Sequence, residues 1–407
     1  MSRRAVLWIA FAVVHLGVAW LGFLLPNQPM GDVYNVYEPW STQALAGGGM
    51  VGISEEWVYP QLAIVPMILA HAFSGISGYI VGWAILVTLV DAVAFVVLVG
   101  SGHSVGRTTA AWFWLAYIAV LGPVGLYRLD GVTVPLVMMA CLWLVGRPWA
   151  ASILLAAATW MKVWPAAVLF AAVVAVRRRS ALVGGAVVVS TLTMLAIVAA
   201  GGGAHAFGFL TEQSDRGLQV EAVVSAPYLW GALHGLEGFW VYWDPGIVTF
   251  QVTGAGIDPV IAAMTPILVI AMAAVGVLGA WAAARGARFV SLFPALSLAL
   301  VSGLIVFNKV GSPQYLCWLI PPIALGLVID RRRWAVPGTV ALAVALLTQL
   351  VYPLLYTGIL APALVPVVIL TLRNAILVVI FVWMLARLVR LMRSPVGRAA
   401  PAHVLVR

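Results

Sequence analysis

The stretch AVLWIAFAVVHLGVAWLGFLL, residues 5–25, is an unbroken apolar run that follows Arg3 and Arg4. An apolar run of about 20 residues is long enough to cross the hydrocarbon core of a bilayer as a helix. The run is longer than the apolar core of a secretory signal peptide, and no clear small-residue cleavage site follows it. We therefore expect it to be retained as a membrane span.

Similar runs recur along all 407 residues, of which 64% are hydrophobic and only 9% are charged. Soluble domains are about 45–50% apolar, so this chain has too few polar side chains to cover a soluble core. The composition predicts an all-α polytopic membrane protein with about 12 transmembrane helices. The expected spans are residues 5–25, 78–100, 108–122, 131–146, 148–161, 163–176, 181–201, 256–283, 289–306, 315–329, 334–352 and 374–390.

Two further apolar segments are expected to lie at the membrane surface or to re-enter it without crossing. The first is WVYPQLAIVPMILAHAF, residues 57–73, which is short and contains an early Tyr-Pro pair; the second is residues 354–372. On this path the whole chain, 1–407, is a single integral-membrane domain. Its two long extracytoplasmic loops span residues 26–77 and 202–255.

The net charge of +9 is explained by the positive-inside rule, because basic clusters fall at the span ends assigned to the cytoplasm, both chain ends included. The cytoplasmic loops are too short for a nucleotide-binding domain and carry no phosphate-binding glycine motif in the required context. Almost all acidic residues fall on the opposite face, the exceptions being Asp91, within the second span, and Asp330. The basic residues on that outer face are Arg128, Lys162, Arg216, Lys309 and Arg373.

Each outer-face residue has a plain structural alternative. Asp32 could cap a helix over residues 33–45, Lys162 could extend to the membrane interface, and Arg128 could simply pair with Asp130. The Trp and Tyr side chains near the span ends could be interface anchors. Taken together, however, cations and carboxylates gathered on one face of an apolar bundle indicate a functional site. Such a site suits a lipid phosphate beside a general base.

The cysteines and histidines point to no metal site. Cys141 and Cys317 both lie in apolar runs, so a disulfide framework is not expected. No histidine pair has the spacing of metal ligands, and His15 and Asp91 have no evident partner in the sequence. Only His234, in the second long loop, is kept as a candidate site residue.

Five short motifs carry a family resemblance: GDVYNVYEPW (31–40), YPQL (59–62), RGLQVE (216–221), KVGSPQYLCWLIPP (309–322) and LRN (372–374). With them, nearly the whole chain resembles glycosyltransferase family 87, whose members are integral-membrane enzymes of the GT-C class. It is most similar to the members that mannosylate phosphatidylinositol mannosides.

The resemblance implies inverting transfer of mannose from polyprenyl-phosphate mannose to a glycolipid, forming an α-1,2 linkage. We expect a monomeric enzyme in the bacterial plasma membrane with an extracytoplasmic active site, no cofactor and no nucleic-acid partner. Because the first loop has GDVY and not an Asp-x-Asp pair, and divalent metals favour clustered oxygen ligands, no metal is expected. Asp32 is then the general base and Glu38 its backup. The candidates for the donor phosphate, in falling order, are Lys162, Arg216, Lys309 and Arg128. The candidates for other substrate contacts are Tyr34, Tyr37, Trp40, Tyr59, Asp130, Gln219, Glu221, His234, Gln314 and Arg373.

Other activities stay open at this point. The acceptor could be lipomannan or arabinomannan, or the donor another polyprenyl-phosphate sugar. From a different class, the chain could be a flippase or transporter of lipid-linked sugars, which would need essential polar groups through the whole depth of the bilayer. A purely structural membrane scaffold is a further alternative.

Overall fold

The computed structural model describes residues 2–214 and 216–393. Within these residues, eight helices are long and apolar enough to cross a membrane. They are α1 (Arg3–Leu24), α4 (Tyr79–Val99), α5 (Val105–Leu121), α9 (Arg179–Ala199), α12 (Ile257–Ala284), α13 (Phe289–Val306), α15 (Arg331–Gln349) and α17 (Leu364–Arg393).

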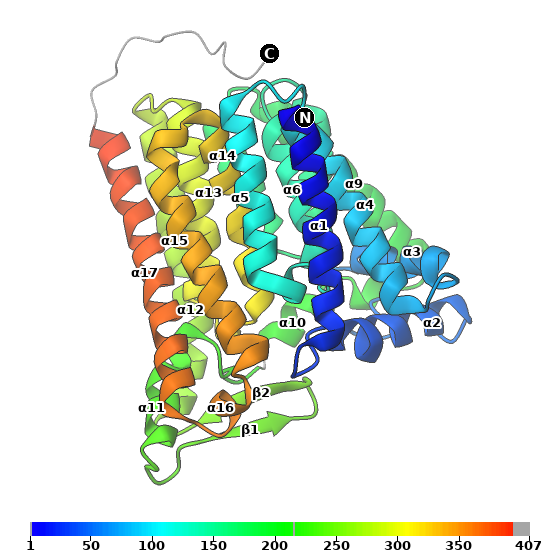
Figure 1. Cartoon of the computed structure of the whole chain (residues 1–407), viewed down its shortest axis with the longest axis vertical. Coiled ribbons are helices and arrows are strands. Elements are labelled where there is room, and N and C mark those ends of the chain that lie inside the picture. Colours follow the sequence, from blue (N-terminus) through cyan, green and yellow to red (C-terminus); the bar gives the residue numbers. More distant parts are fainter. Residues whose placement is uncertain (1, 215, 394–407) are drawn as a thin grey trace.

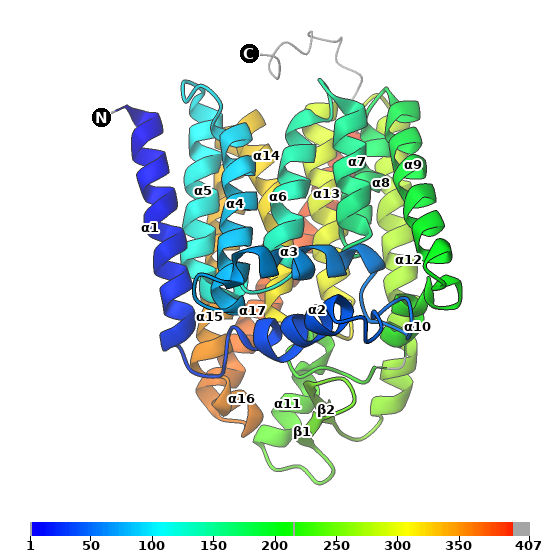
Figure 2. The same cartoon turned by 90° about the vertical axis from the view of Figure 1, so that its right-hand side faces the viewer.

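Shorter apolar helices run alongside these long ones in Figures 1 and 2. They are α6 (Asp130–Trp143), α7 (Pro148–Thr159), α8 (Pro165–Ala175) and α14 (Ile320–Ile329), the last preceded by the 3-10 turn η6 (Pro313–Leu319). The fold is therefore an all-α polytopic membrane protein. The figure of about 12 crossings stays a prediction, because the shorter helices are marginal in length.

Local sequence explains where several helices begin. The Ser2 hydroxyl accepts a hydrogen bond from the Ala5 N–H at the start of α1, and the Asp330 carboxylate does the same for the Arg333 N–H at the start of α15. These side chains satisfy N–H groups that the helix leaves free. The short helices α7 and α8 both open with proline, which suits the first helical turn.

One expected boundary was wrong. Residues 364–372 were expected in a segment that does not cross, but they form the first turns of α17, so the last long helix begins at Leu364 rather than at 374. Only η7 (Leu350–Leu354) and α16 (Thr357–Leu360) form separate turns before it. The helix continues through Arg373 and Asn374, which are buried in the fold and do not mark its start.

The polar loops gather at one end of the bundle, opposite to the start of α1 and the end of α17 (Figure 1). The first loop contains the π-turn η1 (Val33–Tyr37), α2 (Glu38–Leu45), η2 (Gln61–Ala63) and α3 (Ile64–Ser74). In Figure 2, α2 and α3 lie across the long helices instead of along them. This orientation agrees with the expectation that residues 57–73 do not cross.

The second long loop contains η4 (Gly203–His205), α10 (Gly208–Ser214), η5 (Val223–Ser225), α11 (Ala226–Leu233) and an antiparallel hairpin, β1 (Trp240–Asp244) with β2 (Thr249–Thr253). The hairpin was not expected. Its aromatic and β-branched strands favour a sheet, and Asp-Pro-Gly supplies the turn between them. An apolar cluster beneath it contains Leu218, Val220, Leu229, Val252, Val351, Val367 and Leu370.

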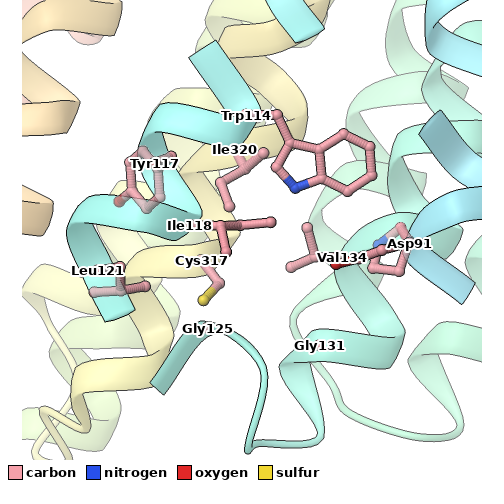
Figure 3. Close-up of a pocket in the computed structure, with 11 residues that line it drawn as sticks. Asp91, Trp114, Tyr117, Ile118, Leu121, Gly125, Gly131, Val134, Cys317 and Ile320 are labelled. Carbon is pink, nitrogen blue, oxygen red and sulfur yellow. The ribbon is translucent and has the colours of Figure 1, made fainter. Parts of the chain in front are cut away.

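A histidine and an aspartate meet inside the bundle. His15 of α1 and Asp91 of α4 are both buried, and His15 Nε2 lies 2.9 Å from Asp91 Oδ2. The expectation that His15 is isolated was therefore wrong, and Asp91 has a partner. Figure 3 shows Asp91 at the edge of a small enclosed cavity that Trp114 and Cys317 also line. A hydrogen-bonding partner satisfies each of these two polar groups at a depth where unsatisfied polar groups are costly.

Candidate active site

Asp32 lies at the polar end of the bundle, directly before the π-turn η1. Its Oδ2 is 3.1 Å from Nε of Arg128, and the two side chains are 34% and 6% exposed. The Asp32 carboxylate makes no helix-capping hydrogen bond, so the helix-cap alternative is wrong. Short π-helical turns often accompany functional sites. The carboxylate is therefore held by a buried cation and still open to a ligand.

Arg128 is fixed by groups from three parts of the chain. Its Nη1 donates to the carbonyls of Pro29 and Tyr127, both at 2.9 Å, and its Nη2 lies 3.5 Å from the Tyr352 hydroxyl. Tyr352 in turn donates to the Asn27 carbonyl at 3.1 Å. Burial alone would lower the pKa of Arg128, but the carboxylate of Asp32 raises it, so the guanidinium stays charged. Arg128 thus ties the first loop to η7.

Asp130 has a different partner from the one the sequence suggests. Instead of pairing with Arg128, its Oδ2 accepts a hydrogen bond from Lys162 Nζ at 2.5 Å, and its Oδ1 accepts one from Trp318 Nε1 at 2.6 Å. Asp130 is fully buried. Burial would lower the pKa of Lys162, but Asp130 raises it. The alternative that Arg128 pairs with Asp130 is therefore wrong. Asp32 pairs with Arg128, and Asp130 pairs with Lys162.

Aromatic rings surround the ammonium group of Lys162. Nζ lies 5.2 Å from the ring centroid of Tyr315, 5.8 Å from that of Trp318 and 6.0 Å from that of Tyr59. These distances allow cation–π attraction. Trp40 packs edge-on against Tyr59, with ring centroids 6.3 Å apart, so the first loop contributes to this group of aromatic rings around Lys162. Lys162 is an enclosed cation and does not extend to the membrane interface.

The two ion pairs belong to one site. Burial raises the pKa of Tyr59, Lys162 lowers it and Asp32 raises it, so this one ring lies close to both pairs. Tyr37 joins them structurally, because its hydroxyl accepts a hydrogen bond from the N–H of Leu129, between Arg128 and Asp130, at 3.1 Å. Tyr37 is buried, so it positions the start of α6.

The RGLQVE and KVGSPQYLCWLIPP motifs pack directly against each other. The Gln219 N–H donates to the Lys309 carbonyl at 3.0 Å, and Gln219 Oε1 accepts from the Gly311 N–H at 2.8 Å. A Cβ on Gly311 would lie 2.3 Å from the backbone nitrogen of Ala222, so only glycine fits there. Lys309 and Gln314 are both buried beside this contact.

A third pair, Glu221 with Arg373, connects this contact to α17. Arg373 Nη2 donates to the Glu221 carbonyl at 2.8 Å and lies 3.9 Å from its carboxylate. Burial raises the pKa of Glu221 to about 7, against the opposing charges of Arg373 and Arg128. Both side chains are almost fully buried, so this pair holds the loop to the bundle and does not contact a ligand directly.

The remaining candidates are placed unequally. Arg216 lies close enough to Tyr315 for its positive charge to act on the tyrosine hydroxyl. The Nε of Arg216 is buried and has no hydrogen-bond partner among the described residues. Tyr34 is partly buried near Arg128. Glu38 begins α2 on the far side of the π-turn from Asp32. His234 is exposed at the end of α11 and bonds only its own helix, at the Trp230 carbonyl.

Sequence reasoning missed several side chains of the site. Tyr315 and Trp318 lie three residues apart within the KVGSPQYLCWLIPP motif. Nothing in that motif indicates that Asp130, the carboxylate that binds Lys162, lies beside them. Tyr352 lies in an apolar run and gave no signal. No group of three or more His, Cys, Asp or Glu side chains able to hold a metal ion occurs within residues 2–214 and 216–393.

The family model of glycosyltransferase family 87 matches residues 57–307, more than half of the chain. The chain belongs to glycosyltransferase family 87. It is therefore a membrane-embedded glycosyltransferase of the type that uses polyprenyl-phosphate sugars. No curated protein sequence matches the chain.

The matched region of this family 87 glycosyltransferase contains Tyr59, Arg128, Asp130, Lys162 and the RGLQVE motif. Asp32, Lys309, Gln314 and Arg373 lie outside it. Physical contacts in the structure, and not the family match, bring these outer residues to the matched ones: Asp32 to Arg128, the Lys309 backbone to Gln219, and Arg373 to Glu221.

Proposed function

We propose that this enzyme transfers mannose from polyprenyl-phosphate mannose to a phosphatidylinositol mannoside, with Asp32 as the general base. The observation that carries the proposal is the Asp32–Arg128 pair: a carboxylate that is open to a ligand, beside a buried cation, at the polar end of a membrane bundle. A general base must reach the acceptor hydroxyl, and an open carboxylate can.

The proposed reaction is one displacement at the anomeric carbon. The acceptor hydroxyl oxygen forms a bond to that carbon as the bond to the donor phosphate breaks, and Asp32 takes the hydroxyl proton. Configuration is inverted, from a β-linked donor to an α-mannoside. The polyprenyl phosphate leaves with its electron pair and therefore needs positive charge, not a proton.

The structure supports a revised ranking of the cations for that phosphate. Lys162 is already bonded to Asp130, although two of its three N–H donors remain. Arg216 has a buried Nε without a partner in the described chain, and its charge acts on the hydroxyl of Tyr315. We propose that Arg216 and Lys162 share the phosphate. Arg128 is committed to Asp32.

The geometry also favours a lipid-borne donor and acceptor on the extracytoplasmic side. The site is formed by the loop end of the bundle, and the segments that surround it, α2 and α3, lie across the helices as interfacial helices do (Figure 2). The basic clusters lie at the opposite end, where Arg331–Arg333 begin α15. By the positive-inside rule that opposite end is cytoplasmic.

The test is mannose transfer by purified protein in detergent with EDTA present, using polyprenyl-phosphate mannose and a phosphatidylinositol-mannoside acceptor. We expect transfer by the wild type and by Glu38→Gln, and loss of transfer by a folded Asp32→Asn variant. Normal transfer by Asp32→Asn would remove Asp32 from the reaction. If a stable wild type fails to transfer mannose but transfers the sugar of another polyprenyl phosphate, that other compound is the donor.

A further inference from the structure

One face of the hairpin of β1 and β2 covers an apolar cluster, although Trp243 on that same face is 46% exposed. Val241, Phe250 and Val252 contribute to the apolar cluster beneath the hairpin. Because side chains alternate along a strand, Trp240, Tyr242 and Asp244 share the other face. On that face Trp240 is 55% exposed and Tyr242 is 39% exposed. Two large aromatic rings thus lie open beside a carboxylate, which the packing of the fold does not require.

Polar residues of β2 pair with this face in the register, and Gln251 among them is buried. The register places Thr253 opposite Trp240, Gln251 opposite Tyr242 and Thr249 opposite Asp244. Gln251 Nε2 donates to Asp244 Oδ2 at 2.6 Å, which orients the carboxylate. Asp244 keeps further acceptor capacity, since an ionised carboxylate accepts up to about four hydrogen bonds.

A row of the sheet that is buried at Gln251 and Gln219 connects the hairpin to the candidate active site. Residues 218–220 add to the free edge of β2, where Val220 N–H donates to the Phe250 carbonyl at 3.1 Å and Val252 N–H donates to the Leu218 carbonyl at 3.0 Å. Gln219 bridges to Gln251, so Tyr242, Gln251 and Gln219 form one cross-strand row. With strands about 4.8 Å apart, the row spans about 10 Å. At its inner end, Gln219 bonds Gly311 of the site.

We propose that this outward face binds the uncharged sugar residues of the acceptor headgroup, with Trp240 and Tyr242 stacking on sugar rings and Asp244 accepting their hydroxyl hydrogens. The inference rests on the proposed function for the identity of the acceptor. The C–H groups of a sugar face carry slight positive charge and suit the negative face of an aromatic ring. The row to Gln219 connects the two rings to the backbone at Gly311, within the KVGSPQYLCWLIPP motif of the candidate site.

Charge selects this occupant over a membrane surface. Residues 217–258 contain Glu221, Glu237, Asp244 and Asp258 and no Lys or Arg. A segment that docks on anionic lipid carries basic residues around its aromatic side chains. An acidic aromatic face instead fits a neutral ligand rich in hydroxyl groups.

Binding of free α-mannotetraose to the full chain tests the inference without any donor. The protein is held in a detergent without sugar headgroups, and saturation-transfer NMR measures affinity. We expect Trp240→Ala and Tyr242→Ala each to weaken binding roughly tenfold, the size expected for truncating a central aromatic contact. The matched control is Trp281→Ala on α12, where the side chain is also 55% exposed. Equal affinity in all four proteins, or no binding by the wild type, overturns the proposal.

Kinetics separate this inference from the proposed function. Trp240→Ala is expected to raise the KM of a multi-sugar acceptor about tenfold and to leave the KM of the donor and transfer to a one-sugar acceptor unchanged. Saccharide binding that depends on Trp240, without mannose transfer, would contradict the proposed function and support the inference. An unchanged KM of the multi-sugar acceptor in Trp240→Ala would contradict the inference and leave the proposed function in place. Trp240-dependent binding to anionic vesicles in place of mannotetraose also overturns it.

Discussion

The Asp32–Arg128 and Asp130–Lys162 pairs join the same kinds of groups, and they meet at the same place, the start of α6. In the first pair the carboxylate is the exposed member and the cation is enclosed. In the second, the carboxylate is fully buried and its second oxygen is already bonded to Trp318. The comparison teaches that access, not residue type, decides which carboxylate can take a proton from a substrate.

The largest expected effect separates the two carboxylates by activity. Asp32→Asn should lower kcat by about 10²–10⁴-fold, the usual contribution of a general base. Its melting temperature should change little, because Arg128 keeps the carbonyls of Pro29 and Tyr127 as partners. Single-turnover transfer rates and a thermal melt in the same detergent measure both quantities. A large stability loss with residual activity would reverse the roles of the pairs.

Asp130→Asn should show the opposite pattern. Removing the carboxylate leaves Lys162 as a buried charge without its partner, which typically costs about 3–5 kcal/mol. We expect a clear drop in melting temperature, partly restored in the double variant Asp130→Asn with Lys162→Met, which removes the stranded charge. A double-mutant cycle of thermal stability measures the coupling. Additive effects of the two substitutions would show that the pair is not coupled.

Tyr352→Phe should give a smaller effect through positioning. The substitution removes the hydroxyl that links Arg128 to the Asn27 carbonyl and leaves the ring in place. Loss of one such hydrogen bond is worth about 0.5–1.5 kcal/mol, so we expect kcat to fall by about fivefold with an unchanged donor KM. A matched change at Tyr356, which contacts Tyr352 only through its ring, is the control: Tyr356→Phe should leave kcat unchanged.

A separate expected effect is on the pH dependence of stability. Burial raises the pKa of Glu221 to about 7, from its ordinary value of 4.5. The folded protein therefore holds a proton that the unfolded chain releases. The contribution is fully present below about pH 4.5 and is lost as the pH rises toward 7. Melting temperatures of the wild type and Glu221→Gln are plotted against pH from 4.5 to 8. The two curves should differ in slope below pH 7 and run parallel only above pH 7. Parallel curves across the range would mean that Glu221 is already ionised in the fold.

Much of the architecture follows directly from the sequence. Each expected span overlaps a helix, because an apolar run in a bilayer must form its backbone hydrogen bonds within itself. The boundary at Leu364 was missed because an apolar run carries no mark of where it enters the membrane. The hairpin was missed because its short strands lie in a loop, where the sequence signal for pairing is weak.

The sequence by itself determined the class of the protein and the end of the bundle that carries the polar groups, whereas Asp32 was singled out only by the family resemblance. The class and the polar end depend on composition and on local runs of residues. Only the tertiary structure decided the partners: Arg128 with Asp32, Lys162 with Asp130, His15 with Asp91, and a cross-strand row from Tyr242 to Gln219. The reason is physical, since every one of these contacts joins separate elements, and no local pattern states which distant charge will lie 3 Å away.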